Sequence, residues 1–474
     1  MEPCHIGLIG LAVMGRNLVL NLESRGYKVA VYNRTAEKTR EFMDGDATGR
    51  NIYSAEDLAG FAGLLERPRR ILLMVQAGEP VDRMLAELVK VLEPGDVIAD
   101  GGNSHYKDTE RRAADLQAKG IHYLGAGISG GEEGALKGPS IMIGGPEEGF
   151  RLMEGPMSSI AARAGDEPCA ARLGPGGAGH LVKMVHNGIE YAVMQAIAEV
   201  YHFLKTAAGM ENHELSRQFQ EYNQGELRSY LVEITAPIFA SKDPETGKDM
   251  IDVVLDQAGQ KGTGRWTVET ALTAAVPVPV ISAAVEARGL SARREQRITA
   301  ARALGPEGQV QHRLEKQQAA DMAAHALLAS MLCAYAQGMN LLREMSGERG
   351  YDIPLSTVAA IWREGCIIRA RLLETIRKAY QDMPDLQSIL LYPQIAKKIT
   401  EARKGLAKTV QTGAESGIPM PAISASLAYL DGLRSEWLPA NLIQAQRDYF
   451  GAHTFQRVDK EGTYHHDWPK PDKI

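Results

Sequence analysis

The chain has 474 residues, of which 44% are hydrophobic and 24% are charged, and its formal net charge is -6. This length corresponds to roughly three domains and can bury a sizeable core without disulfides or a structural metal. The ordinary composition excludes a mainly disordered chain. The slight acidic excess argues against a chain-wide surface for nucleic acid or anionic membrane, because such surfaces are usually basic.

We expect neither secretion nor membrane insertion. No uninterrupted apolar run reaches the ~18 residues of a membrane span, and no basic segment followed by an apolar stretch stands at the N-terminus. The four cysteines lie far apart and form no CxxC motif; they are Cys4, Cys169, Cys333 and Cys366. This spacing predicts a reducing, cytoplasmic location.

The first part of the chain shows the alternation typical of an α/β fold. Short apolar runs alternate with amphipathic stretches, and many of the chain's 48 glycines fall here. We predict a helix over residues 14–24. We predict strands over residues 5–9, 28–32, 71–75, 97–99, 121–124 and 141–143. This order predicts a Rossmann-type N-terminal domain, residues 1–178, with a parallel, doubly wound sheet.

Long helical patterns replace the strands in residues 179–436, which predicts a large all-α domain. The expected helices cover residues 180–208, 211–239, 267–275 and 317–344. We expect loops at 241–248 and 276–280. The stretch 300–316 carries charges of both signs and is predicted to be a solvated surface segment.

The last segment, residues 437–474, is predicted to be an extended C-terminal tail. It contains six aromatic residues, whereas aromatic residues make up 6% of the whole chain. Disordered tails are poor in aromatic residues, and the sequence after Gly451 lacks a helical period. We therefore expect an arm whose rings are buried against its own body or against another subunit.

A glycine-rich turn follows the first strand and opens the first helix. It is a variant of GxGxxG with alanine in the middle, and it consists of Gly10, Leu11, Ala12, Val13, Met14 and Gly15. Gly10 permits the tight turn, Ala12 lets the backbone approach a pyrophosphate, and Gly15 allows the helix to pack closely on the strand. The motif predicts dinucleotide binding. The alternative is a strand–helix turn without a ligand.

The end of the second strand indicates which dinucleotide binds. An NAD site usually has Asp or Glu there to bind the ribose 2′-hydroxyl. This chain has Asn33, Arg34 and Thr35 instead. Arg34 can pair with a 2′-phosphate, and Thr35 can add a hydroxyl. These residues favour NADP, although Arg34 alone could be an exposed cation at a helix start.

One apolar helix carries a polar stripe. Lys183, His186, Asn187 and Glu190 are spaced i, i+3, i+4 and i+7, which places them on one face. Buried charge is unfavourable unless it is paired or serves a site. Lys183 and Glu190 are about 10.5 Å apart along the helix axis, so a substrate of five or six carbons fits between an amine base and a carboxylic acid. The alternative is a structural stripe toward an interface or internal water.

Several segments together closely resemble the 6-phosphogluconate dehydrogenase family, the decarboxylating, NADP-dependent enzymes of the pentose phosphate pathway. The resemblance runs from the first strand to the tail. The matching segments are GLAVMG at 10–15, NRT at 33–35, DGGNS at 100–104, ISGGE at 128–132, KMVHNGIEY at 183–191, KGTGRWT at 261–267 and QRDYFGAH at 446–453.

The resemblance implies two catalytic residues and a substrate, 6-phosphogluconate. Lys183 is the base on the substrate 3-hydroxyl, and Glu190 protonates the enediol that remains after loss of CO2. NADP is the implied cofactor, and no metal is expected. The further implied cofactor contacts are Val75, Gln76, Ala77 and Asn103.

The resemblance also implies the residues that hold the substrate, and a homodimer in which the C-terminal arm of one subunit reaches the other. Carboxylate and hydroxyl contacts are assigned to Asn103, Ser129, Gly130, Gly131, His186 and Asn187. Phosphate contacts are assigned to Tyr191, Lys261, Arg288, Arg447 and His453, and Thr263 is a further expected substrate contact.

The sequence departs from the family pattern at two places. Gln76 stands where the family commonly has lysine, which removes one possible cation near the cofactor phosphates. The segment 284–291 around Arg288 is looser than usual. Two alternatives remain: a β-hydroxyacid dehydrogenase of the 3-hydroxyisobutyrate type, which would lack the acid role of Glu190, and a non-catalytic NADPH-binding protein.

Overall fold

The computed structural model describes residues 2–305 and 313–469. The chain forms two compact units, with the boundary between Leu427 and Ala428. The predicted surface segment 300–316 lies partly outside the described residues. Its first residues, up to Leu304, are exposed at the end of a helix that the sequence analysis did not predict.

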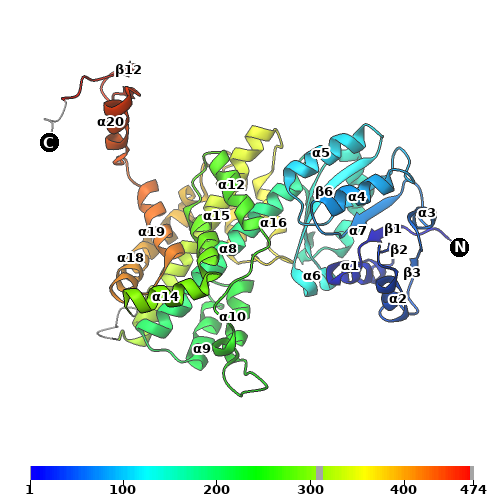
Figure 1. The fold of residues 1–474 in the computed structure, drawn as a ribbon, viewed down its shortest axis with the longest axis horizontal. Coiled ribbons are helices and arrows are strands. Elements are labelled where there is room, and N and C mark those ends of the chain that lie inside the picture. Colours follow the sequence, from blue (N-terminus) through cyan, green and yellow to red (C-terminus); the bar gives the residue numbers. More distant parts are fainter. Residues whose placement is uncertain (1, 306–312, 470–474) are drawn as a thin grey trace. The chain divides into compact units, whose positions relative to one another are not determined.

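An eight-stranded sheet forms the core of the first part of the chain (Figure 1). Its order is β10-β7-β6-β5-β4-β1-β2-β3, which contains the Rossmann order 3-2-1-4-5-6. The strands are β1 (Ile6–Ile9), β2 (Val29–Tyr32), β3 (Ile52–Ser54), β4 (Arg70–Leu73), β5 (Val97–Asp100), β6 (His122–Ser129), β7 (Ser140–Gly144) and β10 (Ala170–Arg172). All six predicted strands are confirmed. β3 and β10 are short and only partly buried, so they lack the apolar run that reveals a strand.

The prediction of an entirely parallel sheet is wrong at one edge. β7 runs antiparallel to β6, and β10 pairs with β7 in parallel. The chain returns from Ser129 to Ser140 through one short helix, and a parallel crossover needs a longer connection. The helices of this part are α1 (Val13–Ser24), α2 (Ala36–Asp44), α3 (Leu58–Gly63), α4 (Glu79–Leu88), α5 (Tyr106–Gln117), α6 (Gly131–Lys137) and α7 (Glu147–Ile160). A small hairpin, β8 (Arg163–Ala164) with β9 (Glu167–Pro168), follows α7.

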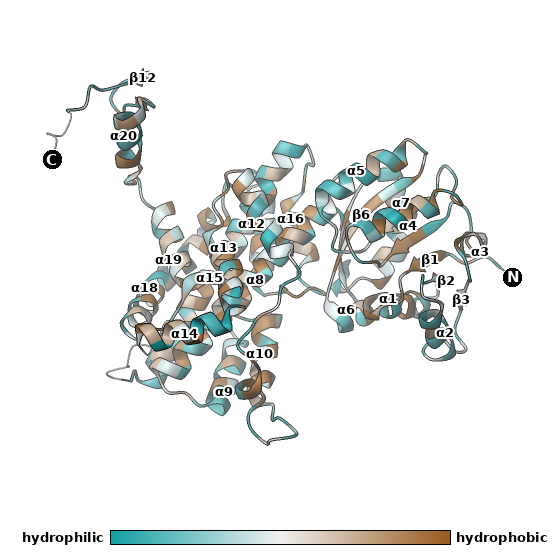
Figure 2. Ribbon diagram, viewed as in Figure 1, coloured by the Kyte–Doolittle hydropathy of each residue, from teal (hydrophilic) through white to brown (hydrophobic). Residues whose placement is uncertain are grey.

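Side chains of each strand alternate between two buried layers, one on each face of the sheet. Leu8 and Leu72 belong to one layer, whereas Ile9, Ile71 and Leu73 belong to the other. Figure 2 shows the hydrophobic strands flanked by helices with much polar surface, such as α2 and α5. This two-residue period fixes which face each side chain occupies. The carboxyl ends of β1, β2, β4, β5 and β6 consequently bring their following loops to one edge of the sheet.

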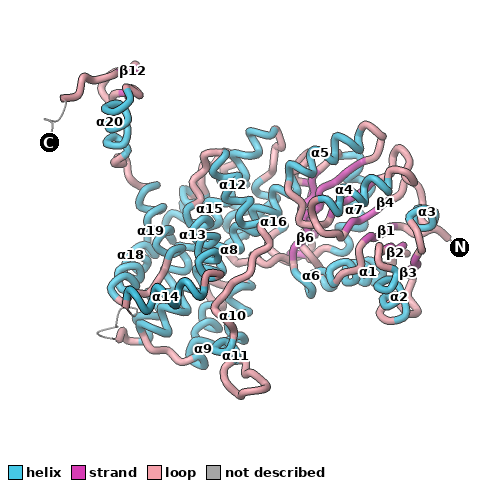
Figure 3. Tube along the Cα trace, viewed as in Figure 1, coloured by secondary structure: helices cyan, strands magenta, loops and turns pink. Residues whose placement is uncertain are grey.

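Helices dominate the residues that follow the sheet (Figure 3). They are α8 (Ala178–Ala207), α9 (Asn212–Tyr222), α10 (Tyr230–Ala240), α11 (Met250–Val253), α12 (Thr263–Thr273), α13 (Pro279–Ser291), α14 (Arg294–Leu304), α15 (Lys316–Arg349), α16 (Leu355–Ile361), α17 (Leu372–Asp382), the 3-10 turn η1 (Ile389–Leu391), α18 (Pro393–Glu415) and α19 (Pro421–Leu433). The predicted helices at 180–208, 267–275 and 317–344 are confirmed. The predicted loop at 276–280 is wrong at its end, because α13 begins at Pro279, a favoured first helical residue.

The single helix predicted over 211–239 is wrong, because two helices occupy it. α9 ends at Tyr222, and the backbone N–H of Ser229 donates to Asn223 Oδ1 at 3.0 Å in the turn between them. The Ser229 hydroxyl then caps α10 by accepting from the N–H of Val232. Gly225 within the turn disfavours a continuous helix.

α8 and α15 form the centre of the helical part. α15 is long and apolar enough to cross a membrane, but 78% of its most apolar window is buried inside the protein, as in the core helix of a globular protein. The first turns of α8 lie directly on β6, because Gly127 leaves room for Lys183. A Cβ on Gly127 would lie 2.3 Å from the Cβ of Lys183.

The second unit contains α20 (Ala440–Gly451) and a small antiparallel hairpin, β11 (Phe455–Gln456) with β12 (Thr463–Tyr464). The predicted tail therefore begins with a helix and is extended only after Gly451. Asp448 is its buried hub: it accepts hydrogen bonds from the ring N–H of Trp468 at 2.8 Å and from the backbone N–H of Thr454 at 2.9 Å. Several rings of this unit pack on one another rather than on a separate surface, among them Tyr449, Phe455, Tyr464 and Trp468.

Candidate active site

The glycine-rich turn connects β1 to α1 in the predicted way. Gly10 has a φ of +106°, and a Cβ there would lie 2.3 Å from the carbonyl oxygen of Met74. A Cβ on Gly15 would lie 1.8 Å from the carbonyl oxygen of Gly10, so only glycine lets α1 pack this closely. The N–H of Leu11 in this turn donates to Asn33 Oδ1 at 3.0 Å, which joins the turn to the end of β2.

A cavity of about 310 Å³ lies beside this turn. It is lined by seven of the predicted cofactor residues: Gly10, Ala12, Asn33, Arg34, Thr35, Val75 and Gln76. Lys38 and Arg83 also line it, and the sequence analysis did not single them out. Three cations around one cavity suit a ligand that carries several phosphates.

The other predicted cofactor residues have different positions. Leu11 is buried in the core below the turn, and the side chain of Val13 is 54% exposed. The residues outside the lining of this cavity are Leu11, Val13, Met14, Gly15, Ala77 and Asn103. Their contacts with a cofactor remain predictions.

α8 brings the predicted polar stripe together in the interior. Lys183, His186 and Asn187 are buried, and Glu190 is partly exposed at the edge. His186 Nδ1 lies 3.9 Å from Glu190 Oε2 and 3.1 Å from Asn187 Oδ1. His186 Nε2 lies 3.1 Å from the hydroxyl of Ser129, at the end of β6. The stripe therefore faces a loop of the sheet.

Burial moves the pKa values of the two predicted catalytic groups toward each other. Desolvation lowers the pKa of the Lys183 amine, and the nearby charge of Glu190 opposes this shift only in part. Desolvation raises the pKa of the Glu190 carboxyl, against the opposing effects of Lys183 and Arg288. These directions increase the fraction of neutral amine and of protonated carboxyl at neutral pH, which suits a base and an acid.

His186 acts as a neutral hydrogen-bonding group in this site. Its burial, with the charge of Lys183, lowers its pKa well below the ordinary value. Its Nδ1–H faces the side-chain amide oxygen Oδ1 of Asn187, so Nε2 accepts from the Ser129 hydroxyl. The ring of Trp362 packs edge-on against it at 5.7 Å between centroids. The imidazole is thus fixed on both sides.

A second group of predicted residues gathers beyond Glu190. The guanidinium carbon of Arg288 lies 3.5 Å from the ring centroid of Tyr191, although 97 positions separate them in the sequence. Arg288 also donates to the carbonyl oxygen of Gly259 at 3.0 Å. Thr263 is buried at the start of α12, and Lys261 is exposed in the preceding loop. The structure therefore assembles a cationic, aromatic end to the site.

Gly130 and Gly131 lie where β6 passes into α6, with φ values of +125° and +64°. Asn103 is exposed on the loop after β5. Arg447 and His453 lie in the second unit and are exposed. Their roles remain predictions.

Three residues of the site were not predicted, namely Lys38, Arg83 and Cys366. Lys38 follows Arg34 by four residues, a helical spacing that could have revealed it. Cys366 is buried near Lys183, and burial raises the pKa of its thiol to about 12, so it is a neutral neighbour. Among the described residues, no three His, Cys, Asp or Glu side chains are grouped so that they could hold a metal ion.

The fold and the site define a dehydrogenase of the Rossmann class, with a dinucleotide cavity and with Lys183 and Glu190 on one face of the first long helix of the helical part. Comparison with known proteins gives the family. Residues 5–174 match the "NAD binding domain of 6-phosphogluconate dehydrogenase", and residues 179–468 match "6-phosphogluconate dehydrogenase, C-terminal domain". The chain belongs to the 6-phosphogluconate dehydrogenase family.

Individual relatives extend over the full chain. The Bacillus subtilis "6-phosphogluconate dehydrogenase, NADP(+)-dependent, decarboxylating" is 50% identical, covering 99% of this chain and 100% of the relative. The Synechococcus elongatus enzyme is also 50% identical, covering 98% of this chain and 99% of the relative. The solved structure of the Plasmodium falciparum enzyme is 41% identical, with a TM-score of 0.95 over 98% of this chain and 100% of that chain. The hydroxyisobutyrate alternative is thereby set aside.

Proposed function

We propose that this protein oxidises 6-phosphogluconate with NADP+ and decarboxylates the product to ribulose 5-phosphate, releasing CO2 and NADPH. The observation that carries this proposal is the pair of Lys183, which is buried, and Glu190, which is partly exposed, on α8. The pKa of Lys183 is lowered and that of Glu190 is raised, so one face of the helix supplies both a base and an acid. Family membership over the whole chain supports the choice of substrate.

The cavity beside Gly10 fits NADP. The φ of +106° at Gly10 favours glycine, and the turn leads directly into the N-terminus of α1, a place that suits a pyrophosphate. Arg34 and Thr35 would hold the 2′-phosphate, with Lys38 and Arg83 beside them in the same lining. When bound, NADP+ accepts the hydride from C3 of the substrate.

Lys183 is the base of the oxidation step. Its neutral amine takes the proton from the 3-hydroxyl while the C3–H bond breaks and its electron pair leaves as hydride. The substrate becomes a 3-keto acid, and Lys183 becomes an ammonium. The lowered pKa of Lys183 makes the neutral amine available before this step.

The same ammonium then serves the decarboxylation. The C1–C2 bond breaks, CO2 leaves, and the electron pair moves toward the 3-oxygen, where the charge of Lys183 stabilises it. Lys183 returns its proton to this oxygen and gives an enediol. Glu190, whose raised pKa favours its protonated form, then protonates the carbon that lost CO2, while the neutral amine of Lys183 takes back the proton of the 3-hydroxyl, and the product ribulose 5-phosphate forms.

The remaining site residues would hold the substrate along its length. Ser129, Gly130, Gly131 and Asn103 are assigned to the carboxylate end, and His186 and Asn187 to the hydroxyls. The contact between Ser129 and His186 supports this assignment, because it joins the two groups in one surface. Tyr191, Lys261, Thr263 and Arg288 are assigned to the phosphate, which carries a charge near -2 and requires several cations.

Arg447 and His453 would complete the phosphate pocket of a second subunit in a homodimer. Apolar side chains of the arm support this proposal, since they are exposed on the single chain: Phe450 is 72%, Leu442 60% and Ile443 60% exposed. An apolar surface of this kind suits a protein partner.

We also propose a cytoplasmic location and three segments for the chain. Residues 1–178 form a cofactor domain, residues 179–436 form a substrate and dimerisation domain, and residues 437–474 form an arm.

Steady-state kinetics of the purified protein test this proposal. NADPH absorbance should rise with NADP+ and 6-phosphogluconate, more slowly with NAD+, and not with 3-hydroxyisobutyrate. Turnover of 3-hydroxyisobutyrate at a comparable rate would contradict the proposed substrate.

A further inference from the structure

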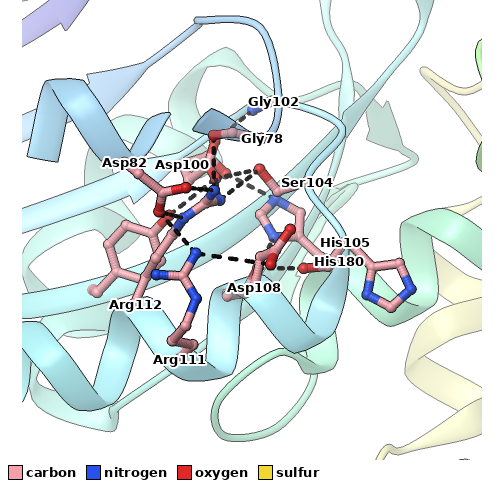
Figure 4. Close-up of polar contacts among 12 residues, drawn as sticks. Gly78, Asp82, Asp100, Gly102, Ser104, His105, Asp108, Arg111, Arg112 and His180 are labelled. Carbon is pink, nitrogen blue, oxygen red and sulfur yellow. Dashed lines mark hydrogen bonds and ion pairs between the residues drawn. The ribbon is translucent and has the colours of Figure 1, made fainter. Parts of the chain in front are cut away.

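A polar cluster lies at the edge of the sheet where the predicted ligand loops gather, and all of its members except Asp82 are buried. It consists of Asp82, Asp100, Ser104, Arg112, Tyr123 and His180, and we call it the Arg112 cluster (Figure 4). The Arg112 side chain is 1% exposed and that of Asp100 is 0% exposed. Figure 4 shows Arg112 between Asp82 on one side and Asp100 with Ser104 on the other.

Asp100 holds the loop that carries Asn103. Its Oδ1 accepts from the backbone N–H of Gly102 at 3.0 Å, and its Oδ2 accepts from the Ser104 hydroxyl at 2.6 Å. The phenol of Tyr123 donates to the same oxygen at 3.0 Å. Asn103 therefore lies between two residues that are both fixed by one buried carboxylate.

Arg112 joins this loop to the cofactor loop. Its Nη1 lies 3.6 Å from Asp100 Oδ2 and donates to Ser104 Oγ at 3.3 Å. Its Nη2 donates at 2.9 Å to the carbonyl oxygen of Gly78, the residue directly after the predicted cofactor segment 75–77. Both oxygens of Asp82 accept from the same guanidinium, at 2.8 and 3.1 Å. The planar guanidinium of Arg112 is thus hydrogen-bonded both to the loop that ends at Gly78 and to the loop that carries Asn103.

His180 joins the Asn103 loop to the catalytic helix. Its Nε2 lies 3.1 Å from the carbonyl oxygen of Asp100, so Nε2–H donates and Nδ1 accepts from the Thr109 hydroxyl at 2.6 Å. Burial lowers the pKa of His180, which agrees with this neutral form. His180 precedes Lys183 by three residues, which is almost one turn of α8.

The fold contains a natural comparison for this cluster. At the opposite ends of β4 and β5, Arg69 Nη1 pairs with Asp96 Oδ2 at 2.9 Å, and both side chains are buried. The Arg69 guanidinium also donates to the carbonyl oxygen of Ala62, which carries no predicted ligand contact. Arg69 and Asp96 join the starts of β4 and β5, whereas the Arg112 cluster joins α5 to α4 and to the end of β5, at the edge where the ligand loops gather.

We propose that Arg112 and Asp100 are positioning residues that couple the cofactor loop, the Asn103 loop and the start of α8, so that NADP(H) and the sugar acid each strengthen binding of the other. This inference rests on the proposed function, because the two ligands are those of that reaction. When one ligand binds, it orders its loop and thereby fixes the hydrogen bonds of that loop to Arg112. The Arg112 side chain is then already held in place for its bonds to the second loop, so the second ligand binds at a lower entropic cost. By thermodynamic linkage, NADP(H) must strengthen binding of the sugar acid by the same factor by which the sugar acid strengthens binding of NADP(H).

NADPH fluorescence measures this coupling without turnover. The dissociation constant of NADPH is determined in the absence and presence of saturating 6-phosphogluconate, and the ratio of the two values is the coupling factor. Proteins with coupled sites commonly show factors of about 5 to 150. We expect a wild-type factor in this range. A wild-type factor of 1 overturns the inference.

Arg112→Lys keeps the charge but cannot reach three partners at once. We expect its coupling factor to fall at least fivefold, toward 1, with a larger rise in the KM values than fall in kcat. Arg69→Lys is the matched control, since it weakens a buried arginine–aspartate pair at the opposite end of β5, away from the ligand loops, and should keep the wild-type factor. Equal factors for Arg112→Lys and wild type overturn the inference, as does an equal loss in Arg69→Lys.

Ser104→Ala provides an independent reading if Arg112→Lys does not fold. It removes one hydroxyl that bridges Asp100 and Arg112, and a loss of coupling of at least twofold is expected; an unchanged factor overturns the inference. Failure of the proposed function has a different signature. Wild-type protein would then neither form NADPH from 6-phosphogluconate nor bind it, whatever the variants do.

Discussion

Replacing Lys183 by methionine should separate activity from stability. The Lys183 side chain is buried, and it makes no hydrogen bond with the described residues of the chain. Methionine has a similar length and no charge, so it fits the space beside Gly127 without desolvating an amine. Replacing buried charges by apolar residues of similar volume is often neutral or stabilising, by about 1–4 kcal/mol. We therefore expect a melting temperature equal to or above that of wild type.

The activity of Lys183→Met should nevertheless be almost abolished. General base catalysis contributes about 10²–10⁴ in rate, and the ammonium's stabilisation of the developing enolate adds to it. We expect kcat to fall at least ~10³-fold, while the NADPH dissociation constant changes little. Lys205→Met is the matched control on the same helix. Lys205 is partly exposed and pairs with Asp252 at 2.8 Å, so its loss should leave kcat unchanged.

NADPH absorbance gives kcat, fluorescence titration gives the cofactor affinity, and a thermal melt gives stability. A kcat for Lys183→Met within tenfold of wild type would refute the assignment of the base. A strong loss of NADPH affinity would show instead that Lys183 supports the cofactor site.

Three further predictions concern the cofactor, the arm and a buried acid. Arg34→Ala should weaken NADP+ binding about 10- to 100-fold, through lost charge-assisted hydrogen bonds, and NAD+ binding hardly at all; titration with both cofactors checks this, and equal losses would contradict the 2′-phosphate role. Deleting the chain after Gln446 should raise the KM for 6-phosphogluconate at least tenfold without changing the NADPH affinity; an unchanged KM would mean that the arm does not build the site. Burial raises the pKa of Glu199, which accepts from the N–H groups of Ala422 and Ile423, to about 7. Its protonation therefore contributes stability fully below about pH 4.5, and this is lost as pH rises through 7. The unfolding free energy of Glu199→Gln minus that of wild type should therefore rise by up to ~3 kcal/mol as the pH increases from about 5 to 8. If this difference did not change with pH, the raised pKa would be contradicted.

Local sequence signals predicted the parts of the structure that depend on local physics. The alternation of Leu8 and Ile9 between two layers, and the positive φ of Gly10, follow from neighbouring residues. The helical spacing from Lys183 to Glu190 predicted that both side chains lie on one face of a helix, and both belong to α8. The break between α9 and α10 was missed because Asn223 and Ser229 act through side-chain caps within an otherwise apolar pattern.

Contacts between distant segments left no signal in a single sequence. The stacking of Arg288 on Tyr191 joins α13 to α8, and Arg112 reaches Gly78 across 34 positions. The reversal of β7 depends on the short return from Ser129 rather than on the composition of the strand. Such features follow from how elements pack, so they could not be predicted from a single sequence.

The stoichiometry of CO2 release tests the central claim most directly. Wild-type protein is incubated with NADP+ and 6-phosphogluconate labelled with carbon-13 at C1, and labelled CO2 and NADPH are measured together. The proposed roles of Lys183 and Glu190 predict one labelled CO2 for each NADPH formed. NADPH formation without labelled CO2 would contradict oxidative decarboxylation and leave a simple hydroxyacid oxidation.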